Sequence, residues 1–247
     1  MGLFIRKSIE TLQAEAQQSG SKTLKRVLGP VSLVALGVGV IIGAGLFSIT
    51  GTVASEYTGP AITLSFIVAA IGCCFAGLCY AEFASMIPVA GSAYTYSYAT
   101  MGELIAWIIG WDLVLEYTVA ATTVSISWSR YLVVFLQGIG IELPHALSAC
   151  PWDGGIVNIP AMLIVVLMSL ILMRGIAGSS LFNGFIVFLK IGVILVFVIL
   201  GWKFIQAENY VPYIPENTGK LGEFGISGIL RGAAIVFFAF LGFDAVS

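Results

Sequence analysis

The chain has 247 residues, of which 59% are hydrophobic and only 10% are charged, and its mean hydropathy is +1.02. Soluble domains carry about 25% charged residues, so this composition excludes a soluble enzyme or a nucleic-acid-binding domain. The four cysteines and the single histidine have neither the spacing of a disulfide framework nor that of a metal site. We therefore expect an integral α-helical membrane protein in contact with the lipid bilayer, not an enzyme, with no metal and no cofactor.

Residues 1–27 form a polar tail that precedes the first apolar stretch. Five of the eleven basic residues lie here: Arg6, Lys7, Lys22, Lys25 and Arg26. Positive charge is retained on the cytoplasmic side of membrane proteins, so we expect a cytoplasmic N-terminus, with part of the tail forming an amphipathic surface helix. Six apolar stretches follow, and we expect them to span the cell membrane at about 28–54, 61–82, 103–131, 157–173, 180–202 and 226–247, the last incomplete.

The segment between the second and third spans, 83–100, is uncharged but too polar to face lipid. It carries five serine or threonine residues and three tyrosines, at positions 94, 96 and 98. Tyrosine is enriched at the level of the lipid headgroups. We therefore expect a cytoplasmic loop that contains a short interfacial helix.

The first span contains a group of glycines in an otherwise apolar run, G-V-G-V-I-I-G-A-G-L-F at 37–47. Each glycine costs about 1 kcal/mol of helix stability relative to alanine, so Gly43 and Gly45 predict a break near the bilayer midplane. A break exposes N–H and C=O groups of opposite polarity, which would suit a zwitterion. The alternative is helix packing, because the spacing of Gly39 and Gly43 lets helices approach closely. The sequence alone leaves both interpretations open.

Lys190 lies near the middle of the fifth span, where a lysine costs about 2.5–3.5 kcal/mol on insertion scales. A charge at that depth indicates a functional site, with a structural ion pair as the alternative. Counting about 1.5 Å of rise per residue along the third and fifth spans places Glu116 and Lys190 at overlapping depths. Glu116 is therefore the expected partner, and Asp112, one turn below it, is a second candidate.

The sixth span contains a second expected break, where Gly242 is followed by Asp244 in F-F-A-F-L-G-F-D. The half-helix that ends near Phe238 and Ala239 would present free carbonyl groups. Interrupted spans at corresponding positions of two repeats point to the binding site of a secondary transporter. The alternative for the aromatic cluster is core packing.

Four stretches together resemble the amino acid–polyamine–organocation superfamily, and within it the bacterial permeases that are similar to cationic amino acid transporters. They are the glycine run at 37–47, Y-A-E-F-A-S-M-I-P-V-A-G-S-A-Y-T-Y-S-Y at 80–98, G-E-L-I-A-W-I-I-G-W-D-L-V-L-E-Y at 102–117 and V-F-F-A-F-L-G-F-D-A-V at 236–246. The resemblance implies an all-α, leucine-transporter-like inverted-repeat bundle with alternating access. Spans 1–5 would form the first repeat, and most of the second repeat would be missing.

The resemblance also implies the roles of particular residues. The substrate carboxylate would meet the amides of Gly43, Ala44 and Gly45, while the substrate amino group would meet carbonyl groups on the first halves of spans 1 and 6, here Ile41, Ile42, Phe238, Ala239 and Leu241. Lys190 would replace the sodium ion of sodium-coupled relatives. That implies proton coupling, with Glu116 at the position of the family's third-span carboxylate.

The expected function is thus a proton-coupled, sodium-independent permease for L-amino acids, with small neutral substrates favoured because glycine and alanine line the expected pocket floor. Two alternatives remain open. One is a truncated membrane fragment that does not transport, because spans that complete the family site are missing. The other is an amine or polyamine carrier of the same fold.

Overall fold

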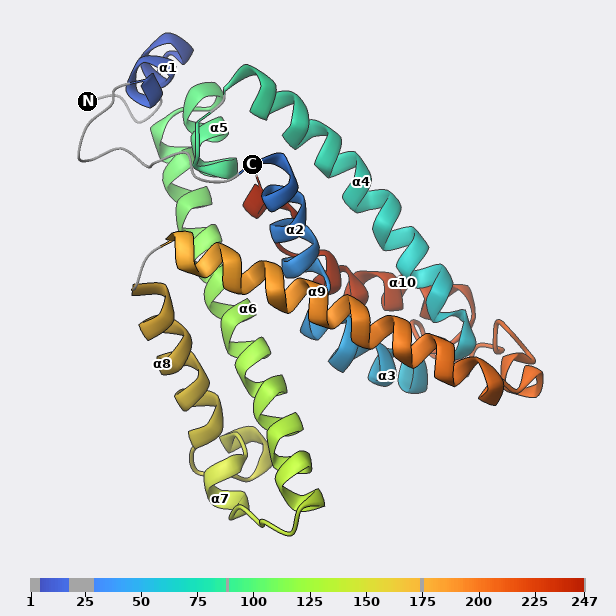
Figure 1. The fold of residues 1–247 in the computed structure, drawn as a ribbon. Coiled ribbons are helices and arrows are strands. Elements are labelled where there is room, and N and C mark those ends of the chain that lie inside the picture. The colour runs from blue at the N-terminus through green and yellow to red at the C-terminus, as the bar shows by residue number, and fades with distance from the viewer. Residues whose placement is uncertain (1–4, 18–28, 88, 174–175, 247) are drawn as a thin grey trace. The chain divides into compact units, whose positions relative to one another are not determined.

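The computed structural model describes residues 5–17, 29–87, 89–173 and 176–246, and every regular element in those residues is helical (Figure 1). The basic residues Lys22, Lys25 and Arg26, on which the expected orientation partly depends, lie outside them. The chain divides into two compact units, one formed by Met1–Gly110 with Ser180–Ser247 and the other by Trp111–Ser179.

The first expected span is interrupted. Helix α2 (Pro30–Ile41) begins with a proline at a position where its missing N–H costs nothing. The helix stops before Ile42 and Gly43, and the chain then continues through a π-helical turn (Gly45–Ile49), α3 (Thr50–Val53) and a second π-helical turn (Ala54–Thr58). Gly59, at φ +60°, turns the backbone through a 3₁₀ turn (Gly59–Ala61) into α4 (Ile62–Met86).

The sixth span is interrupted as well. Helix α10 (Gly225–Val236) passes into a 3₁₀ turn (Phe237–Phe240), and a second 3₁₀ turn (Phe243–Val246) follows Gly242 at φ +97°. Small residues bring α10 against α4: a Cβ at Gly232 would lie 2.7 Å from the Ser65 hydroxyl, which donates a hydrogen bond to the Ile229 carbonyl at 2.9 Å. Val53, Ala69 and Val236 form the buried core beneath this contact.

The tail and the 83–100 segment, both predicted to be cytoplasmic, each contain a short helix. These are α1 (Ile9–Gln17) and α5 (Ser92–Thr100). Leu12 of α1 is buried together with Ile87 and Tyr96, so the tail helix packs on protein. The expected interfacial helix in the 83–100 segment is α5, although Tyr96 is buried in this cluster rather than exposed at its surface.

The unit Trp111–Ser179 contains most of α6 (Glu103–Gly138), α7 (His145–Ser148) and α8 (Ile159–Met173). Helix α6 continues seven residues beyond the expected end at 131, because the residues that follow Tyr131 remain largely apolar. Ser129 donates a hydrogen bond to Asn158 at 2.6 Å, and Arg130 pairs with Asp153 at 2.7 Å. These contacts fasten the connecting loop to both helices at one end of the unit.

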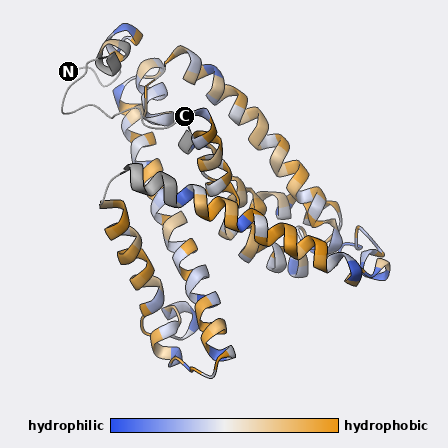
Figure 2. Ribbon diagram, viewed as in Figure 1, coloured by the Kyte–Doolittle hydropathy of each residue, from blue (hydrophilic) through white to orange (hydrophobic). Residues whose placement is uncertain are grey.

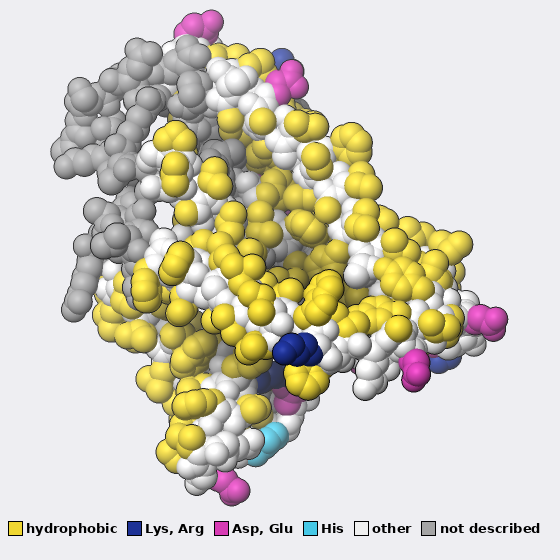
Figure 3. Space-filling view, turned by 45° about the vertical axis from the view of Figure 1, so that its right-hand side comes forward, with side chains coloured by type: hydrophobic (Ala, Val, Ile, Leu, Met, Phe, Trp, Pro, Cys, Tyr) yellow, Lys and Arg dark blue, Asp and Glu magenta, His cyan; other side chains and the backbone are white. Residues whose placement is uncertain are grey.

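Three helical runs in the described part of the chain are long and apolar enough to cross a membrane: Pro30–Met86, Glu103–Gly138 and Asn183–Phe204. The first contains two of the expected spans, and the third is most of α9 (Ile176–Gly201) with the turn after it. Ile159–Met173 and Gly225–Phe240 are apolar but shorter. Helix α8 and most of the described part of α9 are hydrophobic, whereas the loop after α9 is hydrophilic (Figure 2). Hydrophobic side chains cover most of the face drawn in Figure 3, as lipid contact requires.

Candidate substrate and coupling site

The interruption of the first span is a short, well-defined turn. The Gly43 N–H donates to the Ile41 carbonyl at 2.9 Å, and the Gly43 carbonyl accepts from the N–H groups of Leu46 and Phe47 at 3.1 and 3.2 Å. Gly43 therefore closes one half-helix and opens the next. Because the first N–H groups of a helix have no partner within it, Ala44 and Gly45 lie where the second half-helix presents its donors.

Lys190 of α9 binds the carbonyl end of the first half-helix. Its Nζ atom donates to the Gly39 carbonyl at 2.6 Å and to the Ile42 carbonyl at 2.7 Å. The last carbonyls of a helix lack intrahelical partners and carry the negative end of the helix dipole, so a cation is favoured there. The half-buried ammonium of Lys190, which belongs to a separate helix, thus neutralises the partial negative charge of carbonyls that have no partner within the first span.

The absence of a side chain at Gly39 leaves a notch in the surface of α2, and this notch sets the position of α9. A Cβ at Gly39 would lie 2.8 Å from Val187 Cγ2 and 3.2 Å from Asn183 Oδ1, closer than real Cβ contacts allow for the valine. Val187 is buried, and Asn183, Val187 and Lys190 recur at helical spacing on one face of α9. Only glycine at 39 lets this face come close enough for Lys190 to reach the two carbonyls.

The two interrupted spans also touch each other. A Cβ at Gly45 would lie 2.7 Å from the Ala239 nitrogen and still closer to its Cα, and a Cβ at Gly242 would overlap the side chain of Val40. Gly45 and Ala239 are both buried. The backbone of the first span therefore packs directly against the 3₁₀ turn of the sixth, at the depth where both helices are broken.

The two interpretations of the glycine run apply to different glycines. Gly39 and Gly45 are helix-packing positions, filled by α9 and by Ala239 respectively. At Gly43 a Cβ would meet only the Val40 carbonyl within 4 Å, at 3.2 Å, so this glycine belongs to the turn and not to a helix contact. The structure thus shows a break and close packing within the same eleven residues.

Several backbone groups expected to bind substrate already have partners. The Gly43 N–H donates to the Ile41 carbonyl, and the Ile42 carbonyl accepts from the Lys190 ammonium. The Phe238 carbonyl accepts from the Leu241 N–H at 3.3 Å. Carbonyl oxygens have a second lone pair, so Ile41, Ile42 and Phe238 keep acceptor capacity, whereas a single N–H does not. Of the three amides expected to meet a carboxylate, those of Ala44 and Gly45 are the ones this turn leaves for the second half-helix.

The expected pairing of Lys190 with Glu116 stays a prediction. Glu116, like Asp112, belongs to the unit Trp111–Ser179, whereas Lys190 belongs to the other unit. The contacts that the structure gives the Lys190 ammonium are both with backbone carbonyls of the first span.

Sequence reasoning missed three features of this region. Asn183 and Val187 were not singled out, although their spacing from Lys190 places all three on one helix face. Ser48, in the π-helical turn, has a buried hydroxyl for which the described residues provide no hydrogen-bond partner. Asp244, expected at a helix start, is 5% exposed. A burial of that kind cannot be read from the local sequence.

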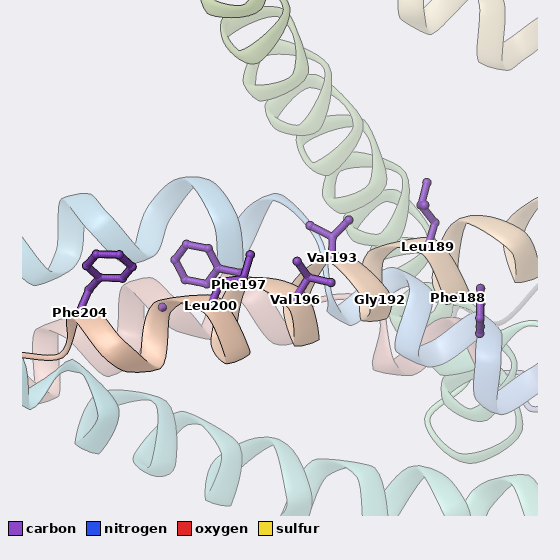
Figure 4. Close-up of a pocket in the computed structure, with 9 residues that line it drawn as sticks. Phe188, Leu189, Gly192, Val193, Val196, Phe197, Leu200 and Phe204 are labelled. Carbon is purple, nitrogen blue, oxygen red and sulfur yellow. The ribbon is translucent and has the colours of Figure 1, made fainter.

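An open groove of this unit lies on α9 and is not a candidate for a polar substrate. It is lined by Phe188, Leu189, Gly192, Val193, Val196, Phe197, Leu200, Gly201 and Phe204 (Figure 4). None of these side chains offers a hydrogen bond to a zwitterion, and most are strongly exposed, such as Phe197 at 76%. This face of α9 has the character of a lipid or helix contact.

Comparison with known proteins identifies the family. The sequence profile of a family described as amino acid permease matches residues 28–247. The chain is 47% identical to a methylthioribose transporter and 48% identical to the branched-chain amino acid permease BcaP, both of Bacillus subtilis, over 99% of this chain and 51% of each relative. It is 36% identical to a vacuolar cationic amino acid transporter of Arabidopsis thaliana, over 99% of this chain and 40% of that protein.

The chain thus spans about half the length of these Bacillus relatives and of the branched-chain amino acid permease BcaP of Lactococcus lactis, to which it is 37% identical. The match nevertheless covers both interrupted helices and Lys190, which are the elements of the site described above. The chain belongs to the amino acid permease family, whose members are membrane transporters and not enzymes.

Proposed function

We propose that the chain forms the substrate-binding and coupling half of a proton-coupled, sodium-independent permease for L-amino acids in the cell membrane. The observation that carries the proposal is the hydrogen bonding of Lys190 to the Gly39 and Ile42 carbonyls at the break of the first span. The proposal takes the N-terminus as cytoplasmic and the transport cycle as alternating access around the two interrupted helices.

The polarity of the break supports a zwitterionic substrate. The N–H groups at the start of the second half-helix, at Ala44 and Gly45, suit a carboxylate. The carbonyls of Ile41 and of the sixth-span turn, Phe238 to Leu241, suit an ammonium group. Glycine and alanine at the floor of this region and phenylalanine beside it favour a small or branched neutral side chain. The relative named as a branched-chain amino acid permease supports this class.

The position of Lys190 supports coupling without sodium. Its ammonium group supplies a fixed positive charge where a metal cation would otherwise neutralise the carbonyl end of α2. Helix α2, against which it packs, contains no titratable side chain, so in this contact α9 supplies the group that can gain or lose a proton. When the lysine loses its proton, the charge that holds α9 to the break is lost, and the first half-helix is freed to move.

A substrate panel tests the proposal. The full-length protein would be purified and reconstituted into proteoliposomes in sodium-free buffer. Amino acid uptake would then be measured with and without an imposed inward proton gradient. We expect saturable, gradient-dependent uptake of L-leucine or L-alanine. Uptake that needs sodium, or none in any gradient, would contradict coupling by Lys190.

Two competitors in the same panel decide the substrate class. Isoamylamine, the amine left when leucine loses its carboxylate, should not compete, because it cannot use the Ala44 and Gly45 donors. Methylthioribose enters the panel because a transporter of that name is 47% identical to this chain. Stronger competition by methylthioribose than by any amino acid would make a neutral sugar thioether the substrate and overturn the zwitterion assignment.

A further inference from the structure

The N-terminal segment Ile5–Leu12 is fixed to the protein by backbone and side-chain contacts. The Glu103 N–H donates to the Ile5 carbonyl at 3.1 Å, and the Lys7 N–H donates to the Tyr98 carbonyl at 3.5 Å. Leu12 is 5% exposed and packs with the buried Ile87 and Tyr96. We call Ile5–Leu12 the tail segment; it bridges the end of α4, helix α5 and the start of α6.

The docking of the tail segment is specific. A nine-residue helix such as α1 is marginal alone in water, and its local support is one cap, in which the Ser8 hydroxyl accepts from the Thr11 N–H at 3.2 Å. Ile9, on the same helix, is 41% exposed, whereas Leu12 is buried. The described contacts of this segment thus include a buried apolar side chain and backbone hydrogen bonds to Tyr98 and Glu103.

Aromatic contacts lead from the tail segment towards the sixth span. Tyr96 stacks on Phe83, with ring centroids 5.2 Å apart, and meets Tyr80 edge-on at 6.1 Å. Tyr80 in turn meets Phe243 edge-on at 5.5 Å. Such pairs are worth about 0.5–1.5 kcal/mol each beyond the burial of their area. Leu12 is thus connected to Phe243 through two intervening side chains, those of Tyr96 and Tyr80.

Phe243 lies at the junction of the two interrupted spans. It follows Gly242, whose φ of +97° is accessible mainly to glycine and where an added Cβ would overlap the side chain of Val40 of α2. Interfaces of this kind repack between discrete arrangements and do not deform gradually. A change in the docking of the tail segment can therefore reach the break through Tyr96, Tyr80 and Phe243.

We propose that the docked tail segment acts as a brace, which means that it stabilises the arrangement of α5 and of the sixth-span break seen here. The tail segment is released when this end of the transporter opens during the transport cycle. The proposal goes beyond the function above but rests on its alternating-access cycle. The tail segment is then a part of the transport machinery whose partner surface, formed by Ile87, Tyr96 and their neighbours, lies within the same chain.

Hydrogen–deuterium exchange of the purified full-length protein tests the brace. The variant Leu12→Asp should undock the tail segment, and Ile9→Asp is the matched control, because it places the same charge at an exposed position of the same helix. In Leu12→Asp we expect exchange to accelerate about tenfold at both 92–100 and 237–246, as removal of a buried leucine contact allows. Ile9→Asp should leave both segments unchanged.

A double-mutant cycle separates coupling from local loosening. In a Tyr80→Leu background, Leu12→Asp should still accelerate exchange at 92–100 but no longer at 237–246, because the aromatic connection is broken. If Leu12→Asp accelerates exchange only at 92–100 in protein that keeps Tyr80, the proposal is overturned. If Leu12→Asp fails to fold, Leu12→Ala gives the same two readouts with smaller shifts.

The exchange result does not depend on which substrate is carried. Protein that shows the expected pattern of exchange but no amino acid uptake would overturn the proposed substrate and leave the brace supported. Normal leucine uptake with unchanged exchange at 237–246 in Leu12→Asp would overturn the brace and leave the permease function standing.

Discussion

The breaks in the first and sixth spans lie against each other, but they are stabilised differently. In the sixth span the turn is local: the Leu241 N–H donates to the Phe238 carbonyl, and Gly242 provides the positive φ that the reversal requires. In the first span the Gly43 turn satisfies only part of the exposed backbone, and the Gly39 and Ile42 carbonyls depend on Lys190, which is 148 residues away from Ile42 in the chain.

This difference indicates which break is able to respond to a proton. A turn that satisfies its own groups is insensitive to the charge of other helices. A turn that depends on an ammonium changes its stability when that ammonium is neutralised, because an unpaired polar group at membrane depth costs several kcal/mol. Under the proposed function, the first-span break is therefore the one that responds to the charge of Lys190, whereas the sixth-span turn is held by its own hydrogen bond and by the conformation of Gly242.

Lys190→Ala should have the largest effect. We expect proton-gradient-driven uptake to fall by about 100-fold, because hydrogen bonds from a charged group are worth about 1.5–3 kcal/mol each. Lys190→Arg should also fail, since arginine stays protonated at any accessible pH. Lys203→Ala, which removes an exposed lysine just beyond α9, is the control. Gradient-driven uptake by Lys190→Ala equal to that of the unchanged protein would return Lys190 to a structural role.

Gly45→Ala tests the contact between the two breaks. Its Cβ would lie 2.7 Å from the Ala239 nitrogen, so backbone must move, and we expect a loss of roughly 1–3 kcal/mol in unfolding free energy. Gly51→Ala is the matched control, because no atom lies within 4 Å of that Cβ and alanine favours helix. Thermal unfolding in detergent measures both. Equal melting temperatures for the two variants would mean that the spans do not pack this closely.

Gly39→Ala should sharpen the comparison by affecting only the first-span break. The added methyl group would press on Val187 and move α9 away from α2, which lengthens the hydrogen bonds of Lys190. We expect the pH dependence of uptake to shift while substrate binding changes less than about threefold, the equivalent of about 0.7 kcal/mol. Gly192→Ala, on an open face of α9, should shift neither. The test fails if both variants give the same pH profile.

The smallest expected effect concerns the loop that leads into α10. The Thr218 hydroxyl, at 2.9 Å, and then the Lys220 ammonium hold the pKa of Glu223 below its ordinary value of 4.5. A lowered folded-state pKa contributes stability that is complete above 4.5 and is lost as the pH falls through the lowered value. Glu223→Gln should therefore melt slightly earlier than the unchanged protein at neutral pH and equally in strong acid. If the difference in melting temperature between the two proteins persists in strong acid, the charge of Glu223 is not its cause.

Much of the site could be predicted from particular residues. Lys190 stands out because a lone charge in an apolar span has few explanations, and Gly43 marks the turn because glycine weakens a helix wherever it occurs. The assignment of Gly45 and Phe238 to substrate binding stays a prediction, and the structure adds that Gly45 packs on Ala239 and that the Phe238 carbonyl has a local partner. Neither contact leaves a periodic signal in the sequence.

The sequence by itself determined the class of protein, the number of apolar stretches, the two interruptions and the presence of a lysine within an apolar stretch, because hydropathy and helix propensity are properties of local composition. The tertiary structure decided that the lysine binds the Gly39 and Ile42 carbonyls, that Gly39 and Gly45 are notches for other helices, and that Leu12 ties the tail to α5. Those contacts join residues far apart in the chain. They follow from how helices pack against one another, which no single stretch of sequence specifies.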